Sequence, residues 1–580
     1  MSLNNGSDLE GEGNSANVSS SSPNLSYNSV DNDHGNKPNK RATNHQENNY
    51  TDEERRPLLS PDDPGVTPLN VRNVRMSKLI LSFSSSISFI WFVLLIVSDF
   101  VSIPGFNNHG RSFLEINLMI LSLCSNLVSQ LFFTIPSEVD RIVGYTAAGL
   151  IGFDLLLVLV VPGLRYDQYM VGIITFIWTL FSCIFGCFAD YLVEKGKIHE
   201  EIRLTGRPET RKTFYEYFIV TIRNFLRCIL LFFFLLISLN IWLDAFDSRV
   251  HPWGEKIRVQ DNSFGLHLSC FGDVYNNISH TEVYEQGAML NSDQPIILVE
   301  AGQYDSAEEI SSWVEELYHL NKVDRYCIYD RPGMGFSDSA PSPVSIGITV
   351  DLLNEALTKE NIYGPFLLVG FDIGGLYTRV FASRYQSQVH SLLLVDAWSQ
   401  NLLKRDPFGG STSDGKKNRW ENLWETIGIR PMNTRLGIRM WYHGMISPYQ
   451  LISWKDVLFH RYGSRERIYG DDMRLRGKFL RAKLQEQISA GILSYNEVSN
   501  SNVNLGNLPV AVISSDLMIK NSLNWGKWQR ELTKISKNNL EWVISEGDHK
   551  IWENPRGKNE VQDLLLRLIG TKTGYLTLDE

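Results

Sequence analysis

Five long apolar segments follow one another in the first half of this 580-residue chain, at about 79–101, 113–135, 142–161, 170–193 and 218–243. About 20 apolar residues in a helix are enough to cross a bilayer. Short polar breaks and few charges separate the segments, which argues against the alternative of buried helices in a large soluble core. The sequence therefore predicts a multi-pass α-helical membrane region with five spans at residues 67–246.

Two further regions flank the membrane region. Residues 1–66 are dense in Asn, Ser, Asp, Glu and Gly and have almost no large apolar side chains. Such a segment cannot bury enough surface to offset its chain entropy, so we expect a disordered polar tail. Residues 247–580 have mixed charge and form a separate third region. The net charge of −10 averages over these unlike parts, and we expect no nucleic-acid partner.

Basic residues predict the topology. Arg72, Arg75 and Lys78 precede the first span, and the loop between the fourth and fifth spans is also rich in Lys and Arg. Because such residues stay on the cytoplasmic side, the N-terminus is expected there. Arg223 and Arg227, at the start of the fifth span, could snorkel toward that side. Five crossings then leave the C-terminal region on the lumenal or exterior side.

Short motifs bear on trafficking and on the exposed side. Asn277-Ile278-Ser279 is a glycosylation sequon that would be accessible in a lumen. The tail carries Glu54, Leu58 and Leu59 in an arrangement that looks like an acidic dileucine signal, which sorting adaptors read on the way to a vacuole or lysosome. An accidental Leu pair is the alternative. We expect an endomembrane protein, of the vacuole or ER rather than the plasma membrane, with the mitochondrion left open.

Polar residues within the spans allow a second interpretation. Glu115 and Asp154 could line a polar path through the bilayer. Hydrogen bonding between helices is the more ordinary role of such residues, and the sequence contains no repeat or broken-helix pair typical of transporters. We therefore favour an anchor over a pore.

From about residue 257, short β-rich runs alternate with amphipathic helices. Strands are predicted at 295–299, 325–329, 366–369, 391–395, 510–514 and 540–544, and helices at 307–320, 350–357 and 375–384. This alternation is typical of a mostly parallel sheet with helices on both faces. Such sheets place functional residues at the carboxyl ends of their strands.

One pentapeptide constrains the chemistry. Gly370-Phe371-Asp372-Ile373-Gly374 lies between a predicted strand and a predicted helix, where serine hydrolases carry Gly-x-Ser-x-Gly. Glycines suit a sharp turn in which side chains would collide, and the helix N-terminus supports developing negative charge. Asp372 is a different nucleophile from the usual serine.

Three blocks together are more specific than any one of them. They are Tyr-Asp-Arg-Pro-Gly-Met-Gly-Phe-Ser-Asp at 329–338, Leu-Leu-Val-Gly-Phe-Asp-Ile-Gly-Gly at 367–375, and Glu-Gly-Asp-His at 546–549 followed by Glu-Asn-Pro at 553–555. With them, residues 257–570 resemble the α/β-hydrolase fold family. The whole layout also resembles a fungal group of uncharacterised multi-pass membrane proteins. The resemblance implies a helical cap at about 397–500.

The resemblance also implies site residues. It places Asp372 at the nucleophile position and His549 at the base position. The acid of the triad follows one of two strands, so Asp516 and Asp396 are both candidates, and we favour Asp516. The oxyanion donors would be two backbone N–H groups, those of Ile373 and Gln303.

The Asp at the elbow implies an ester intermediate that water activated by His549 would hydrolyse, as in epoxide hydrolases and haloalkane dehalogenases. Those relatives usually carry Trp where this chain has Ile373, and a His-Gly-x-Pro loop is absent, so neither subclass is favoured. We expect a membrane-tethered hydrolase for an apolar or lipid-like substrate, with the bilayer as partner and without cofactor or metal. A catalytically silent fold used for binding or scaffolding is the alternative.

Cysteine usage leaves one question open. Four of the six cysteines fall in the membrane segments, while Cys270 and Cys327 lie in strand-like runs of the last region. The latter two could pair in an oxidising lumen, but spacing alone does not establish a disulfide. Their spacing does not suggest a metal site.

Overall fold

The computed structural model describes residues 63, 65–110, 113–208, 213–274, 294–403, 438–459, 467–501 and 505–571. Nearly all of the predicted tail, with Glu54, Leu58 and Leu59, lies outside the described residues, as does the sequon at Asn277. By their contacts, the described residues belong to one compact unit.

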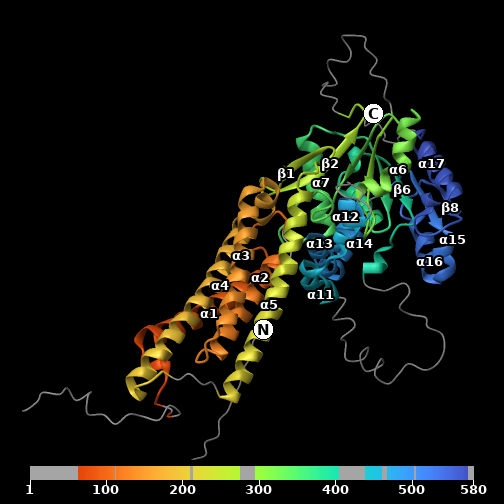
Figure 1. The fold of residues 1–580 in the computed structure, drawn as a ribbon. Coiled ribbons are helices and arrows are strands. Elements are labelled where there is room, and N and C mark those ends of the chain that lie inside the picture. Colours follow the sequence, from red (N-terminus) through yellow and green to blue (C-terminus); the bar gives the residue numbers. More distant parts are fainter. Residues whose placement is uncertain are drawn as a thin grey trace, which may run out of the picture. The chain divides into compact units, whose positions relative to one another are not determined.

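Five helices in the first half are long and apolar enough to cross a membrane, which confirms the predicted five-span region (Figure 1). The two longest of these helices include polar residues at their ends, so they extend beyond the apolar stretches seen in the sequence. A capping box of Thr213 and Glu216 begins the last one, and a left-handed Gly206 ends the one before it. The five are α1 (Arg72–Phe100), α2 (Leu114–Leu131), α3 (Glu138–Val160), α4 (Pro162–Thr205, with a break at Tyr169) and α5 (Phe214–Asp247).

Charged side chains pair inside the bundle. Arg223 of α5 lies 2.6 Å from Asp140 of α3 and 2.7 Å from Asp190 of α4, and Arg227 lies 2.7 Å from Asp140. Both arginines are buried, so they do not snorkel as the sequence suggested. The reason is that facing carboxylates on two neighbouring helices satisfy them inside the bundle.

The two acidic residues considered as a polar path bond to nearby groups. Asp154 accepts hydrogen bonds from Ser238 (2.6 Å) and Trp242 (3.0 Å), both on α5. Glu115 accepts one from Asn108. These contacts tie helices and loops together, which is the ordinary role of polar groups within a bundle.

The second half contains an eight-stranded sheet with the order β1-β2-β4-β3-β5-β6-β7-β8. β1 and β2 were not predicted from the sequence. β1 pairs antiparallel with β2, and β2 pairs antiparallel with β4, while the other neighbours pair in parallel. The mostly parallel sheet is therefore confirmed. Its strands are β1 (Glu255–Val259), β2 (Phe264–Phe271), β3 (Ile296–Glu300), β4 (Tyr326–Tyr329), β5 (Phe366–Phe371), β6 (Val389–Val395), β7 (Val510–Ser515) and β8 (Asn539–Ser545).

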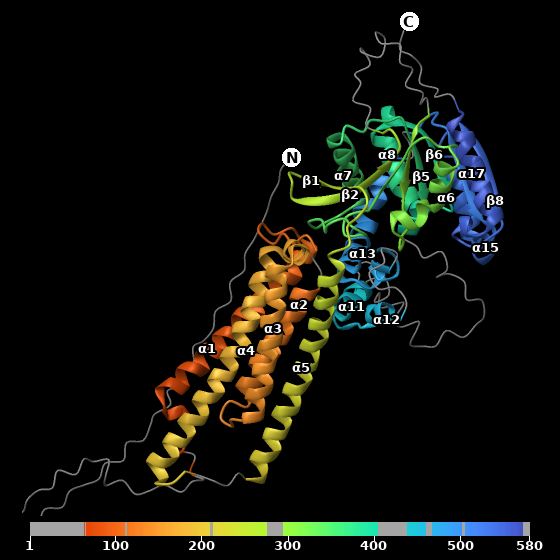
Figure 2. The same ribbon diagram turned by 45° about the horizontal axis from the view of Figure 1, so that its top comes forward.

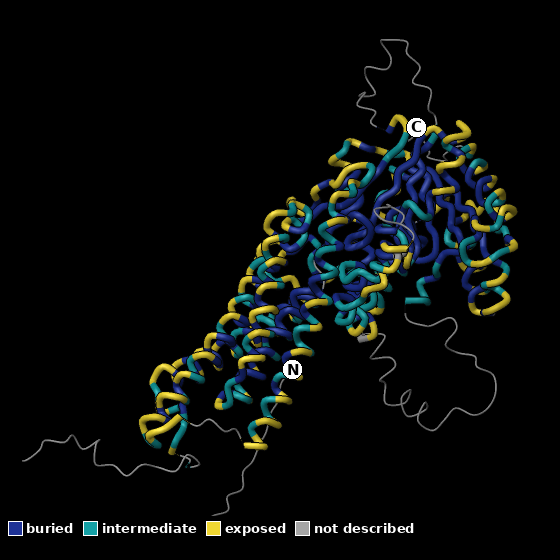
Figure 3. The backbone as a smooth tube through the Cα atoms, viewed as in Figure 1, coloured by how far each residue is buried: buried dark blue, intermediate teal, exposed yellow. Residues whose placement is uncertain are grey.

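Helices cover both faces of this sheet (Figures 1 and 2). Alternate residues of β3 separate between the two layers, since Leu298 joins one hydrophobic cluster and Val299 the other. The central strands are the most deeply buried part of the chain (Figure 3). One face carries α7 (Ile346–Lys359) and α8 (Gly374–Arg384), and the other carries α6 (Ala307–His319) and α17 (Pro555–Ile569).

Helices between β6 and β7 occupy the region expected for a cap. They are α11 (Ile438–Ile446), α12 (Ile452–Phe459), α13 (Gly477–Ser489) and α14 (Tyr495–Ser501), and α15 (Asp516–Asn521) and α16 (Leu523–Leu532) follow β7. Short 3₁₀ or π turns lie at Pro68–Asn70, Gln386–Gln388, Gln400–Leu403, Ser447–Tyr449, Arg467–Asp471, Met473–Leu475, Ala490–Ser494 and Ile551–Glu553.

Cap helix α13 also contacts the membrane helices. Its Leu484 packs in one hydrophobic cluster with Leu95 of α1 and Met119 of α2. Arg481 of α13 pairs with Asp99 of α1 at 3.1 Å, and both side chains are buried. The cap and the bundle therefore share a core.

A disulfide joins the antiparallel neighbours β2 and β4. Cys270 of β2 and Cys327 of β4 are direct partners in the register, with their Cα atoms 4.1 Å apart, and their sulfurs are bonded. The pairing left open by the sequence is thus formed in the structure.

Candidate active site

The turn after β5 has the geometry of a nucleophile elbow. Asp372 has φ of 53°, a left-handed conformation that non-glycine residues rarely adopt. A Cβ on Gly370 would lie 2.5 Å from the Thr378 hydroxyl, and one on Gly374 would lie 2.6 Å from the Glu300 carbonyl oxygen. Only glycine fits at these two positions, as the motif predicted.

The two oxygens of Asp372 lie in different surroundings. Oδ2 accepts a hydrogen bond from the backbone N–H of Gln303 at 2.8 Å, and the N–H of Ile373 also donates to this carboxylate. Oδ1 lies 3.3 Å from Nε2 of His549. Oδ2 is held by the Gln303 N–H while Oδ1 faces the imidazole.

The other ring nitrogen of His549 contacts Asp396. The Nδ1 to Oδ2 distance is 2.6 Å, and Oδ1 of Asp396 accepts from the Trp525 indole at 2.8 Å and from the Ser515 N–H at 3.2 Å. Asp396 is completely buried at the end of β6, and its φ is 40°. A buried, fully hydrogen-bonded carboxylate fixes both the tautomer and the orientation of the histidine.

The favoured acid, Asp516, does not contact His549 through any described hydrogen bond. It begins α15, and its carboxylate accepts the N–H of Gly547 at 3.0 Å and pairs with Lys520. Both Asp396 and Asp516 follow a parallel strand, but the left-handed turn at Asp396 directs its side chain to the imidazole. The structure therefore places the alternative, Asp396, beside His549 in place of Asp516.

Burial and charge shift the pKa values at this site. Burial alone would lower the pKa of His549, but the hydrogen bonds and charges of Asp372 and Asp396 raise it to about 10. Burial pushes the pKa of Asp372 upward, yet the hydrogen bonds from His549 and the two backbone N–H groups leave it lowered. Burial raises the pKa of Asp396. These shifts favour a protonated His549 flanked by the carboxyl groups of Asp372 and Asp396.

Arg331 supports the loop that presents the Gln303 N–H. Its guanidinium donates to the carbonyls of Ala301 and Gly302, each at 2.7 Å, and pairs with Glu300 at 3.0 Å. The sequence analysis did not assign this residue, although it lies within the block at 329–338. The sequence signal that could have identified Arg331 is a charged side chain in a Pro-Gly-rich turn. Such a side chain needs several hydrogen-bond acceptors when it is buried.

Cap helix α13 brings a buried cation close to the elbow. Lys483 is fully buried, contacts Glu486 on the same helix, and lies 5.3 Å from the ring centroid of Tyr304. Burial lowers the pKa of Lys483, while the nearby negative charges, including Asp372, oppose that shift. Lysines are common in amphipathic helices, so the sequence does not indicate that Lys483 is buried near the elbow. Only the tertiary structure reveals this position.

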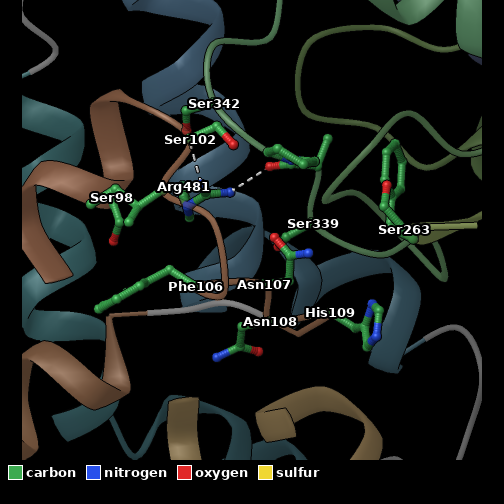
Figure 4. Close-up of a pocket in the computed structure, with 14 residues that line it drawn as sticks. Ser98, Ser102, Phe106, Asn107, Asn108, His109, Ser263, Ser339, Ser342 and Arg481 are labelled. Atoms are coloured by element: carbon green, nitrogen blue, oxygen red, sulfur yellow. Dashed lines mark hydrogen bonds between the residues drawn. The ribbon is translucent and has the colours of Figure 1, made fainter. Parts of the chain in front are cut away.

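A separate polar cavity lies where the loop after α1 meets α13 (Figure 4). Its volume is about 20 Å³, enough for about one water molecule. Arg481 lines it and donates to Ser342 at 2.9 Å and to the Ala340 carbonyl at 3.0 Å. None of the elbow residues lines this cavity. Within the described ranges, no group of three or more His, Cys, Asp or Glu residues has the arrangement of a metal site.

The strand order, the elbow and the His549 position define the C-terminal half as an α/β-hydrolase-fold domain attached to a five-helix membrane region. Residues 295–427 match the family described as α/β hydrolase fold, and residues 33–270 match a region of unknown function, DUF2417. The chain is thus a membrane-associated, hydrolase-like protein.

Relatives with the same layout occur in yeasts. An uncharacterized vacuolar membrane protein of Saccharomyces cerevisiae is 34% identical over 87% of this chain and 88% of its own length. The chain belongs to the family of this fungal membrane protein. An uncharacterized protein of Schizosaccharomyces pombe is 24% identical, covering 88% of this chain and 92% of its own.

Two solved structures are similar to part of the chain. One is a thermophilic esterase from Thermogutta terrifontis, with 14% identity and a TM-score of 0.32, covering 55% of this chain and 100% of that one. The other is the epoxide hydrolase CorEH, with 16% identity and a TM-score of 0.35, covering 54% and 97%.

Proposed function

We propose that this protein is a membrane-anchored hydrolase whose nucleophile is Asp372 and whose substrate is apolar or lipid-like. The observation that carries the proposal is that the two oxygens of the Asp372 carboxylate make different contacts. Oδ2 is held by the Gln303 N–H at 2.8 Å, so Oδ1 is the oxygen directed at a substrate and at His549. An ionised carboxylate held in this way is suited to attack an electrophilic carbon.

In the first step, Oδ1 of Asp372 forms a bond to the substrate carbon, and the leaving group departs with the bonding electrons. The proton that His549 carries at rest passes to that leaving group. Esterification removes the charge of Asp372, and with it one of the two interactions that raise the pKa of His549. The imidazole is then neutral and, oriented by Asp396, can act as a base.

In the second step, His549 takes a proton from water as the water oxygen attacks Cγ of the ester. The negative charge develops on Oδ2, which the backbone N–H groups of Gln303 and Ile373 stabilise. The bond between Cγ and Oδ1 then breaks, and the alcohol product takes the proton from His549. The second proton of the attacking water passes from the new Asp372 carboxyl group to His549, which restores the starting state with one water oxygen in Asp372.

We also propose that the domain acts in the lumen of the vacuole. Support comes from the vacuolar membrane relative in S. cerevisiae and from the basic residues Arg72, Arg75 and Lys78 ahead of α1. The Cys270–Cys327 bond agrees with an oxidising lumen. The adaptor-binding role of the tail residues Glu54, Leu58 and Leu59 is part of the same proposal.

The test is turnover in oxygen-18 water. Full-length protein is incubated with epoxides, alkyl halides and lipid esters, and the peptide containing Asp372 is analysed by mass spectrometry. We expect heavy oxygen in Asp372 after several turnovers, and a trapped alkyl adduct on Asp372 in the His549→Gln variant. Turnover with label only in the product, or turnover that survives Asp372→Asn, would contradict the mechanism.

A second function is favoured by one observation. A histidine with its pKa raised to about 10 between two carboxyl groups is also a stable ion-paired arrangement, compatible with a catalytically silent binding module. In that case Asp372→Asn and His549→Gln cells would keep their wild-type phenotype, measured against a deletion strain. If both variants show the phenotype of the deletion strain while the protein is present at its normal level, the silent binding module is excluded.

A further inference from the structure

The exposed side of α12 is apolar. Leu451 and Ile452 are 40% and 50% exposed, and Leu458 and Phe459 are each 70% exposed. With a helical repeat of 3.6 residues, these four and exposed Lys455 fall on one side, which we call the outer face of α12. A helix on a water-exposed surface normally turns such a face inward, so this arrangement is the reverse of the usual one.

The inner side of the same segment is attached to a membrane helix. The Trp454 indole donates to the carbonyl of Leu239 at 3.1 Å, and the Asn240 side chain donates to the carbonyl of Pro448 at 2.7 Å. Both acceptor and donor on α5 lie well before its end at Asp247. At a rise of about 1.5 Å per residue, Leu239 is about 12 Å from that end along the helix.

A second membrane helix holds the segment at a similar level. Tyr449 donates its hydroxyl hydrogen to the side chain of Asn117, about one turn into α2, at 2.9 Å. Gly444 of α11 lies so close to Phe113 that a Cβ would meet its ring at 2.0 Å. Both ribbon views place α11 and α12 alongside the end of α5 nearest the sheet (Figures 1 and 2).

We propose that α11 and α12 are immersed in the lipid leaflet at the C-terminal end of α5, with the outer face of α12 against the acyl chains. The segment is bonded to α5, which is long and apolar enough to cross a membrane, and the attachment at Leu239 lies before the end of that helix. Lys455 in the middle of the outer face suits this position, because its long stem reaches the headgroup phosphates while staying apolar along its length.

The immersion has a consequence for the site. Met440 of α11 and Met473 pack in one cluster with Phe479 and Leu484 of α13, the helix that carries Lys483. The part of the cap in lipid therefore shares a core with the part beside Asp372. Resting on the proposed function, this places the substrate class among molecules dissolved in the leaflet.

The test uses full-length protein in phosphatidylcholine vesicles that contain a lipid with a diazirine in its acyl chain. After irradiation, lipid adducts are mapped by mass spectrometry. We expect adducts on the peptide containing Leu458 and Phe459, at a yield comparable with that at lipid-facing Phe232 of α5. Tyr363 and Ile544, which are 56% and 53% exposed on the α/β domain, serve as unlabelled controls.

A charged variant completes the test without relying on enzyme activity. A carboxylate is strongly disfavoured among acyl chains, so we expect Leu458→Glu with Phe459→Glu to lower the adduct yield on α12 by about tenfold. Labelling at Phe232 stays unchanged and reports that the bundle is folded, and Ile544→Glu is the matched control. If α5 is labelled while wild-type α12 is labelled no more than Ile544, the proposal is wrong.

Discussion

At the residue scale, the candidate site depends on the positions of a few polar atoms. Asp372 binds two backbone donors and faces His549, and His549 binds Asp396. Each carboxylate therefore has one defined role in the proposed reaction, and the roles can be separated by substitution.

The two candidate acids give opposite expectations. Asp396→Asn removes the acceptor that orients His549, so we expect turnover to fall on the order of 10³-fold or more, as for the acid of a serine triad. Asp516→Asn affects contacts with the Gly547 turn and Lys520, away from His549, and we expect turnover within about threefold of wild type. The kcat of both variants on the same substrate checks this. The reverse order would show that Asp516 is the functional acid.

Arg331 is expected to affect turnover by holding the loop that presents the Gln303 N–H. Arg331→Lys keeps the charge but lacks the planar fork whose two separate nitrogens reach the carbonyls of Ala301 and Gly302, so the loop that presents the Gln303 N–H is held less firmly. We expect kcat to fall on the order of 10²-fold with little change in KM, because the lost interaction acts on the transition state. Arg556→Lys, at an exposed surface pair, is the control. An equal rise in KM without loss of kcat would point to substrate binding.

His549 should make stability depend on pH in a defined direction. Its folded-state pKa is about 10 against an ordinary 6.5, so the folded state holds the proton more tightly. This contribution to stability is fully present below about pH 6.5 and is lost as the pH rises through about 10. We expect the Tm of the wild type to fall more steeply over that range than the Tm of His549→Gln, in detergent micelles. Parallel curves would contradict the raised pKa.

At the element scale, the β2–β4 pair is fastened by a covalent bond that closes a loop with a sequence separation of 57 residues. The chain-entropy account assigns such a loop a stabilisation of about 4 kcal/mol. We expect Cys270→Ser together with Cys327→Ser to lower the Tm, and addition of reductant to have no further effect on that variant. Alkylation followed by mass spectrometry should find both thiols protected in the wild type until reduction. Immediate alkylation would place the domain in a reducing compartment.

At the scale of the whole molecule, buried ion pairs join the membrane helices to the cap. Asp99 of α1 and Arg481 of α13 are both buried and lie 3.1 Å apart. Asp99→Asn leaves the guanidinium without its carboxylate, and we expect a loss of about 3–5 kcal/mol of stability. Unfolding in detergent measures this. Glu546→Gln, at the exposed pair with Arg556, should change stability by about 1 kcal/mol or less.

A double substitution distinguishes the pair from the individual side chains. Asp99→Leu with Arg481→Met replaces both charges by apolar groups, and we expect it to be more stable than Asp99→Asn alone. A double variant that is as unstable as the sum of the single ones would show that each residue stabilises the fold through its other contacts.

The sequence by itself determined the parts that depend on local pattern. Five apolar stretches of sufficient length predicted α1 to α5, because the bilayer demands that backbone groups be satisfied within a helix. Short β-rich runs alternating with amphipathic helices predicted the sheet, and the glycines around Asp372 predicted the elbow, since both patterns reflect rules that act over a few residues.

Only the tertiary structure decided what depends on contacts between distant segments. Asp396 and Asp516 both follow parallel strands, and the backbone turn at Asp396 selects it as the partner of His549. The Cys270–Cys327 bond depends on the register of β2 against β4, and the outward apolar face of α12 depends on its attachment to Leu239. Residue spacing along a chain does not encode these directions, because each is set by side chains that meet only after the layers have packed.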